Sequence, residues 1–202
     1  MMEYGRMENE IILHGRLEEA PQLSHSNHGE QFYVFPLTVH RLSGAADRLN
    51  VLVSERLPVA CVLQPGDEVT IRGEVRSYNN RSGQGSRLVI TVLARALVRE
   101  PGQDDNRLKL QGVLCKPAIF RCTPLGRNIC DMMLAVNRRY GRSDYLPCIA
   151  WGTLAHRCAA LEVGDRVRVE GRLQSRTYTK NSGDAVQERT AFEVSVMTMP
   201  EE

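Results

Sequence analysis

Aromatic and basic residues are interleaved in the second half of the sequence. Four aromatic residues lie among five cations, and the set is Tyr140, Tyr145, Trp151 and Tyr178 with Arg138, Arg139, Arg142, Arg176 and Lys180. Unpaired bases stack on aromatic side chains for roughly 1–3 kcal/mol each, while Arg or Lys contacts the phosphates. These residue types together predict a surface for single-stranded nucleic acid. Packing in strands and hairpins is the alternative role for any one of these aromatics.

The elements that must position these residues occur twice along the chain. R-S-Y-N-N-R-S-G (76–83) is followed one hundred positions later by R-T-Y-T-K-N-S-G (176–183). The match continues in three further pairs of segments, which are 9–17 with 106–114, 37–44 with 134–141, and 63–75 with 161–173. The spacing is nearly constant, between 97 and 100 residues, and such repetition in the same order indicates a tandem duplication.

A short polar stretch separates the two copies. E-P-G-Q-D-D-N (100–106) contains Pro and Gly and has the composition of a linker. We therefore expect an N-terminal domain at residues 1–103 and a C-terminal domain at residues 104–202.

Most of each copy has the two-residue periodicity of strands with one buried face. Val167, Val169 and Leu173 alternate with charged residues, and 191–196 alternates in the same way. Residues 153–162 instead have apolar residues at helical spacing, and their counterpart 54–63 contains Pro58, which predicts a shorter helix there.

Three strands, a helix and two more strands are typical of the OB-fold. The sequence thus predicts an all-β protein with two tandem OB-fold five-stranded Greek-key barrels, each with one short helix. The repeated Ser-Gly stretches, R-S-G-Q-G-S (81–86) and N-S-G-D (181–184), are expected at the tips of the last hairpin of each barrel.

Composition and charge limit the remaining possibilities. Hydrophobic residues make up 42% and charged residues 25%, which is enough apolar material for a core. No apolar run approaches the roughly 20 residues of a spanning helix, and the first ten residues do not resemble a signal peptide, so we expect a cytoplasmic protein with no membrane partner. Residues 1–103 carry 11 basic and 12 acidic residues, against 15 and 12 in residues 104–202, so the second copy is the basic one.

Catalytic and metal-binding motifs are missing from the sequence. It contains no G-x-x-x-x-G-K-[ST], G-x-S-x-G or H-E-x-x-H motif, so we expect a protein that is not an enzyme and needs no cofactor. The six cysteines form no C-x-x-C pair and are interpreted as reduced apolar residues, with a metal site as the alternative. His156 and Cys158 point about 200° apart on a helix, which makes them poor joint ligands.

Five segments extend over nearly the whole second copy, and they are N-R-L-K-L-Q-G-V-L (106–114), T-P-L-G (123–126), L-A-V-N-R-R-Y (134–140), D-Y-L-P-C-I-A-W-G-T-L-A (144–155) and V-E-G-R-L-Q-S-R-T-Y (169–178). Through these segments, residues 106–198 resemble the DNA-binding domain of bacterial single-stranded DNA-binding proteins. It implies that Tyr140, Tyr145, Trp151 and Tyr178 stack on bases. It also implies sequence-independent binding in DNA replication, recombination or repair. The cations expected to contact phosphates are Arg138, Arg139, Arg142, Arg172, Arg176 and Lys180.

The first copy resembles the same family less closely. Ser43, Arg48 and Ser54 stand opposite the first three aromatics, and only Tyr78 matches the fourth. We therefore expect scaffolding or dimerisation from residues 1–103, with weaker DNA contact through Tyr78, Arg41, Arg76 and Arg81.

The family commonly assembles four OB folds, which implies a homodimer for a chain that carries two. Family members usually continue into an acidic tip that recruits repair and replication proteins, whereas this sequence ends at M-T-M-P-E-E (197–202). Recruitment through such a tail is therefore not expected. The alternative function is an OB-fold protein-interaction or primosome-accessory module with little DNA affinity.

Overall fold

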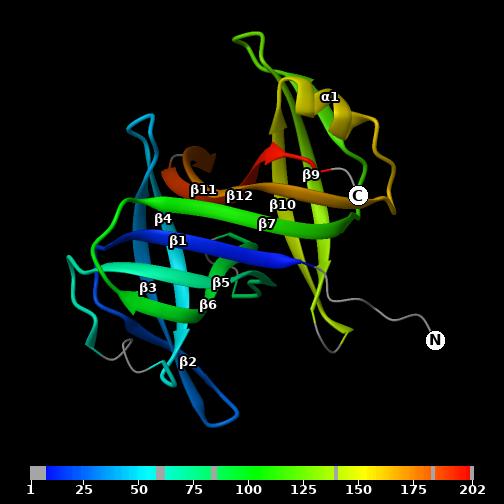
Figure 1. The fold of residues 1–202 in the computed structure, drawn as a ribbon. Coiled ribbons are helices and arrows are strands. Elements are labelled where there is room, and N and C mark those ends of the chain that lie inside the picture. Colours follow the sequence, from blue (N-terminus) through cyan, green and yellow to red (C-terminus); the bar gives the residue numbers. More distant parts are fainter. Residues whose placement is uncertain (1–7, 58–61, 83–85, 139–140, 183–184, 201–202) are drawn as a thin grey trace. The chain divides into compact units, whose positions relative to one another are not determined.

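A computed structural model describes residues 8–57, 62–82, 86–138, 141–182 and 185–200 (Figure 1). Within them lie twelve strands and one helix. They are β1 (Asn9–Leu17), β2 (Gln22–Asn27), β3 (Glu30–His40), β4 (Ala46–Ser54), β5 (Glu68–Asn79), β6 (Leu88–Arg99), β7 (Asp105–Leu114), β8 (Ile119–Cys122), β9 (Asn128–Asn137), β10 (Ser143–Trp151), α1 (Thr153–Ala159), β11 (Arg166–Ser182) and β12 (Ala185–Thr198).

The chain forms two compact units. The first-repeat unit contains residues 11–107 together with 174–192, and the second-repeat unit contains residues 1–10, 108–173 and 193–202. Residues 174–182 and 185–192, named here the hairpin arm, are the outer parts of β11 and β12 and belong to the first-repeat unit. The division into domains at 1–103 and 104–202 stays a prediction drawn from the repeat.

The first-repeat unit contains a closed β-barrel. β1 pairs with β5 and β3, β3 pairs with β4, β4 runs parallel to β6, and β6 pairs with β5. This strand order, with one parallel pair in an otherwise antiparallel barrel, is that of an OB fold. The interior is filled by fully buried side chains from β1, β3, β4 and β5, including Ile11, Leu13, Phe35, Leu37, Leu49 and Ile71.

The second-repeat unit has the same connectivity. β7 pairs with β11 and β9, β9 pairs with β10, and β10 runs parallel to β12. Val167, Val169 and Leu173 all point inward, as the alternation predicts. The expected all-β architecture of tandem OB folds is confirmed.

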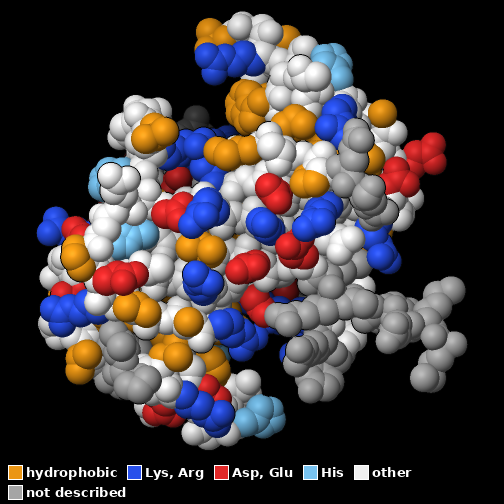
Figure 2. Space-filling model, viewed as in Figure 1, with side chains coloured by type: hydrophobic (Ala, Val, Ile, Leu, Met, Phe, Trp, Pro, Cys, Tyr) orange, Lys and Arg blue, Asp and Glu red, His pale blue; other side chains and the backbone are white. Residues whose placement is uncertain are grey.

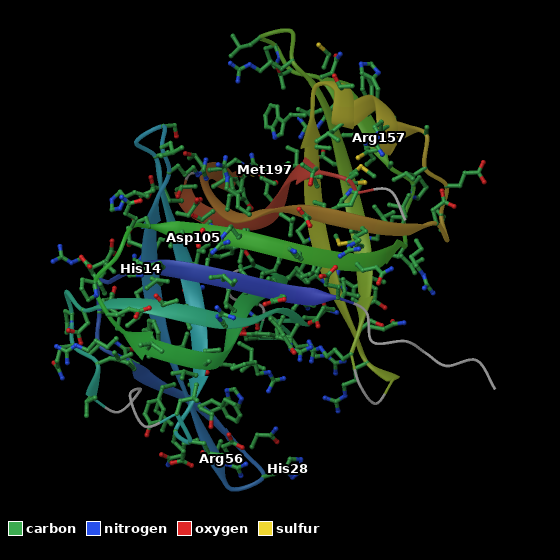
Figure 3. All side chains as sticks on the ribbon, in the orientation of Figure 1. His14, His28, Arg56, Asp105, Arg157 and Met197 are labelled. Carbon is green, nitrogen blue, oxygen red and sulfur yellow. The ribbon has the colours of Figure 1, made fainter. Side chains whose placement is uncertain are left out.

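Helix α1 confirms the helix predicted after Gly152. It packs against β8, β9 and β10 and buries Ala155 and Cys158 (Figure 1). Arg157, labelled on α1 in Figure 3, donates to the backbone oxygen of Met199 at 3.4 Å. Residues 58–61 of the counterpart segment lie outside the described residues. None of the helical structure described has the length and apolar character needed to cross a membrane.

Each unit also has a short strand that the sequence did not predict. β2 pairs with β3, and β8 pairs with β9. Every residue of β2 and of β8 is exposed, so neither strand shows the alternation of buried and exposed residues by which strands are found in a sequence. The two short strands are additions to the five strands predicted for each barrel.

A Gly-Asp turn before the fourth barrel strand has the same hydrogen bonds in both units. Asp67 Oδ2 accepts from the backbone N–H of Gln64, and Asp165 Oδ2 accepts from that of Glu162, each at 2.8 Å. Gly66 and Gly164, which precede the aspartates, have φ of 93° and 103°. The left-handed conformation favours glycine at these two positions, which explains why the Gly-Asp pair appears in both copies.

A second pair of glycines permits close approach of strands. A β-carbon built on Gly73 would lie 2.3 Å from the backbone oxygen of Leu93, and one built on Gly171 would lie 2.0 Å from that of Ser195. Both distances are far below van der Waals contact. These glycines therefore let the neighbouring fourth and fifth strands of each barrel approach closely at this point.

Candidate nucleic-acid interface

Strand β10 places two of the predicted stacking residues on one face. Tyr145 and Trp151 are six residues apart, so both side chains point to the same side of the strand. Their Cα atoms are separated by about 20 Å along an extended strand. The exposed fractions are 48% for Tyr145 and 40% for Trp151, so each ring keeps a free surface while resting partly on its neighbours. This geometry suits stacking with unpaired bases.

The neighbouring strands place a cation in the same row as Trp151, two strands away. Ile129 of β9 lies directly opposite Trp151, and Arg121 of β8 lies opposite Ile129 on the next strand. Arg121 is exposed, and its Nε donates to Asp131 at 2.7 Å. Arg121 is not among the cations predicted from the sequence, although it stands in an aromatic and basic segment, I-F-R-C at 119–122.

Arg138 is held by a buried carboxylate. Its Nε donates to Asp144 Oδ2 at 2.7 Å, and the Asp144 side chain is completely buried. The first-repeat unit has the same pair, in which Arg41 Nε donates to the buried Asp47 at 2.8 Å. Because a buried carboxylate must be neutralised, these ion pairs favour structural roles for both arginines. Phosphate contact by Arg138 and Arg41 stays a prediction.

The other predicted cations of the second-repeat unit differ in exposure. Arg142 is exposed in the turn before β10, where it is available to a phosphate, whereas Arg172 on β11 is only half-exposed. Arg139 and Tyr140 lie outside the described residues, and so does the side chain of Lys180.

The fourth predicted aromatic lies on the hairpin arm, in the first-repeat unit. Tyr178 is 37% exposed, and Cζ of Arg176 lies 5.8 Å from the centroid of its ring. A guanidinium at this distance makes a cation–π contact. An exposed ring with a cation next to it on the same strand face provides one stacking surface and one phosphate contact side by side.

Tyr78 of β5 is 56% exposed, more than Tyr145, Trp151 or Tyr178. Its neighbour Arg76 forms an ion pair with Glu74, and both side chains are largely buried. Arg81 is exposed near the tip of the same hairpin. Arg87 is exposed just before the opposite strand of that hairpin, so within the described residues the first repeat presents one exposed aromatic from its own strands with two exposed cations near it.

The outer surface over β7 and β11 carries charges of both signs. Arg168 Nε lies 2.9 Å from Glu8 Oε2, and Lys109 Nζ lies 3.7 Å from Glu170 Oε1. Figure 2 shows Lys, Arg, Asp and Glu side chains interspersed over these strands. Such a mixture gives no continuous positive stripe, so this surface is a poor track for phosphates.

Phe120 is a third exposed aromatic of the second-repeat unit, at 41%. It lies opposite Cys130, so it points to the other face of the sheet from Trp151. Its ring is 4.9 Å from that of His156 on α1. Phe120 therefore packs beside the helix and is not part of the face that carries Tyr145 and Trp151.

The described cysteines are free thiols, and three of them are buried. Burial raises the pKa of Cys158 to about 11 and raises the pKa of Cys148 further. Cys158 Sγ lies 3.4 Å from Met199 Sδ, which is a packing contact. Within the described ranges, no three His, Cys, Asp or Glu side chains are placed to hold a metal ion. Cys61 lies outside the described residues.

Fold and surface together define an all-β protein built from two OB folds, with an aromatic face on the second. The model of the Single-strand binding protein family matches residues 105–200. Single-stranded DNA-binding protein 1 of Clostridium acetobutylicum is 36% identical over 87 residues, which cover 39% of this chain and 79% of that protein. Single-stranded DNA-binding protein A of Bacillus subtilis is 35% identical over 88 residues, which cover 40% of this chain and 51% of that protein.

The chain belongs to the single-strand binding protein family. It spans about half the length of several curated relatives that it matches. Among solved structures, the wild-type single-stranded DNA binding protein from Thermus aquaticus has a TM-score of 0.79 at 22% identity, covering 98% of this chain and 94% of that chain. That likeness extends over both repeats and supports the tandem fold.

Proposed function

We propose that the protein binds single-stranded DNA without preference for sequence, in DNA replication, recombination or repair. The observation that carries the proposal is the half-exposed pair Tyr145 and Trp151 on one face of β10. Family membership supports it, because relatives that match this domain are single-stranded DNA-binding proteins by name. The protein acts by binding, with base stacking on aromatics and phosphate contacts from arginines, and carries out no catalysis.

Trp151 supplies a direct test because it is the only tryptophan in the chain. A base stacked on the exposed part of its ring would change the emission, so titration with oligo-dT is expected to quench the fluorescence strongly. Unchanged emission at saturating oligo-dT, together with no shift of the oligonucleotide in a native gel, would overturn the proposal. That result would favour the protein-interaction or primosome-accessory role instead.

Salt dependence tests the phosphate contacts separately. Each contact releases a counterion, so the logarithm of the binding constant should fall with the logarithm of salt concentration by about 0.7 per contact on a single strand. Arg142 and Arg176 are the exposed cations next to the stacking residues, and replacing either with Gln should lower this slope by about one contact. An unchanged slope in both variants would show that neither Arg142 nor Arg176 contacts a phosphate.

Unequal contributions of the two repeats form part of the proposal. Tyr178→Ala should weaken oligo-dT binding much more than Tyr78→Ala, because Tyr178 has a cation over its ring and belongs to the repeat with the aromatic face. Fluorescence titration of both variants measures the difference. Equal losses would mean that both barrels bind DNA.

Assembly and location complete the proposal. The first repeat acts as a scaffold or dimerisation domain, and two chains associate into a homodimer with four OB folds. Light scattering should then give a mass near twice the chain mass, and a monomer mass would refute this part. Contacts with replication or repair proteins and a cytoplasmic location belong to the same proposal.

A further inference from the structure

The outward face of β3 and β4 in the first-repeat unit corresponds to the aromatic face of the second-repeat unit. Arg48 and Ser54 occupy the positions that correspond to Tyr145 and Trp151, at a constant spacing of 97 residues. The guanidinium of Arg48 lies against Glu18 and Glu19 from the segment after β1. This side chain is therefore engaged with carboxylates.

The hairpin arm is bonded to the start of β4. The backbone N–H of Ser175 donates to Asp47 Oδ1 at 2.8 Å, and the backbone N–H of Arg48 donates to the Ser175 hydroxyl at 2.9 Å. Asp47 is the buried carboxylate that also accepts from Arg41. Its position is thus fixed by the barrel core, which makes it a rigid attachment point.

A cavity of about 690 Å³ lies between the arm and this face. Ser175 and Thr177 of β11 line it, as do Glu188, Thr190 and Phe192 of β12. Arg176 and Tyr178 alternate with the lining residues, so they point to the opposite side of the arm. One side of the arm therefore covers the first barrel while the other side presents the cation and the aromatic ring.

The charges around the cavity disfavour a nucleic-acid strand inside it. Glu19 and Glu188 line the cavity, and its one lining cation among the described residues, Arg48, is already paired with Glu18 and Glu19. A phosphate would meet more negative than positive charge there. The cavity is therefore a poor site for DNA.

We infer that the first barrel holds the hairpin arm in the position that binds DNA, with Ser175 and Asp47 as the positioning residues. This inference rests on the proposed function of single-stranded DNA binding. An arm held by two hydrogen bonds presents Arg176 and Tyr178 in one orientation before DNA arrives. Ordering the arm beforehand removes an entropic penalty from binding. It also agrees with the absence of an aromatic at position 48, which lines the cavity beneath the arm.

Ser175→Pro tests the attachment. Proline removes both hydrogen bonds of Ser175, and it breaks no ladder bond between β11 and β12 because the N–H of Ser175 points to Asp47. Ser175→Ala is the milder variant and removes only the hydroxyl. Thr190→Val is the matched control, because Thr190 lines the same cavity and its hydroxyl makes no hydrogen bond within the described residues.

The first readout is limited trypsin digestion without DNA, followed by mass spectrometry. Cleavage after Arg176 and Arg189 should become about 5- to 150-fold faster in Ser175→Pro, and about 2- to 10-fold faster in Ser175→Ala, since each lost hydrogen bond raises the open fraction of the arm. Thr190→Val should match wild type. If Ser175→Pro does not fold, judged by circular dichroism, Ser175→Ala decides the question alone.

The second readout is oligo-dT affinity by Trp151 fluorescence. Ser175→Pro should weaken binding measurably, but by no more than Arg176→Gln and Tyr178→Ala do together, and adding Ser175→Pro to that double variant should weaken it no further. Wild-type cleavage rates in both Ser175 variants would overturn the attachment. Faster cleavage with unchanged affinity would overturn the positioning role. Failure of the wild-type chain to bind oligo-dT would instead refute the proposed function, while the digestion still measures the attachment.

Discussion

Tyr145→Ala is the substitution that most directly tests the aromatic face. The ring is 48% exposed on a strand whose backbone pairs with β9 along its whole length, so its removal should leave the barrel folded. The lost stacking is worth about 1–3 kcal/mol, which corresponds to a roughly 5- to 150-fold higher Kd for oligo-dT. Tyr145→Phe keeps the ring and should bind within about twofold of wild type on the same reasoning.

The assay uses the same fluorescence signal for all variants because Trp151 is retained in each. Phe120→Ala is the control, since Phe120 has a similar exposed fraction of 41% and points to the other face of the sheet. It should leave the Kd near the wild-type value. Equal losses in Tyr145→Ala and Phe120→Ala would show that no particular face binds DNA. A wild-type Kd for Tyr145→Ala would exclude stacking at this position.

Three further predictions concern stability and reactivity. Asp144→Asn should lower the free energy of unfolding in urea by about 2–4 kcal/mol. This is less than the loss for a fully buried pair because the Arg138 side chain is 26% exposed. An unchanged urea midpoint would refute the pairing argument. Gly171→Ala should lower the free energy of unfolding by about 1–3 kcal/mol, because the alanine β-carbon would meet the backbone oxygen of Ser195. Thermal melting at the wild-type temperature would contradict this. With iodoacetamide at pH 8, the exposed Cys122 should react well before the buried Cys158. Burial raises the pKa of Cys158 to about 11, so its thiol stays protonated at this pH. Equal rates of modification in peptide mapping would refute this.

Periodicity and repetition in the sequence were sufficient to predict the barrels. Val167 and Val169 alternate with charged residues, and the structure buries both valines. The stripe containing Cys158 predicted α1, and the repeated Gly-Asp pairs mark turns that only glycine adopts easily. These features depend on neighbours in the chain, and for that reason one sequence reveals them.

Features that depend on distant contacts could not be predicted in this way. The ion pair of Arg138 with Asp144 joins the ends of β9 and β10, and no periodic pattern indicates that the carboxylate is buried. β8 is exposed along its whole length, so it has no hydrophobic pattern. The attachment of the hairpin arm joins Ser175 to Asp47, which are separated by 128 residues. Exposure of Tyr145 and Trp151 also required the structure, because a strand has two faces and the sequence does not say which is covered.

The hydrogen bonds of Ser175 limit how the two halves of the gene product can be separated. A fragment that begins at the linker would retain Ser175 but lose Asp47 and Arg48, to which the arm is attached. We expect such a fragment to be a poorer choice for expression and crystallisation than the whole chain. Deleting the first repeat would therefore also remove part of the support for the second. We expect selection to retain the first repeat because the hairpin arm of the second depends on it for its attachment.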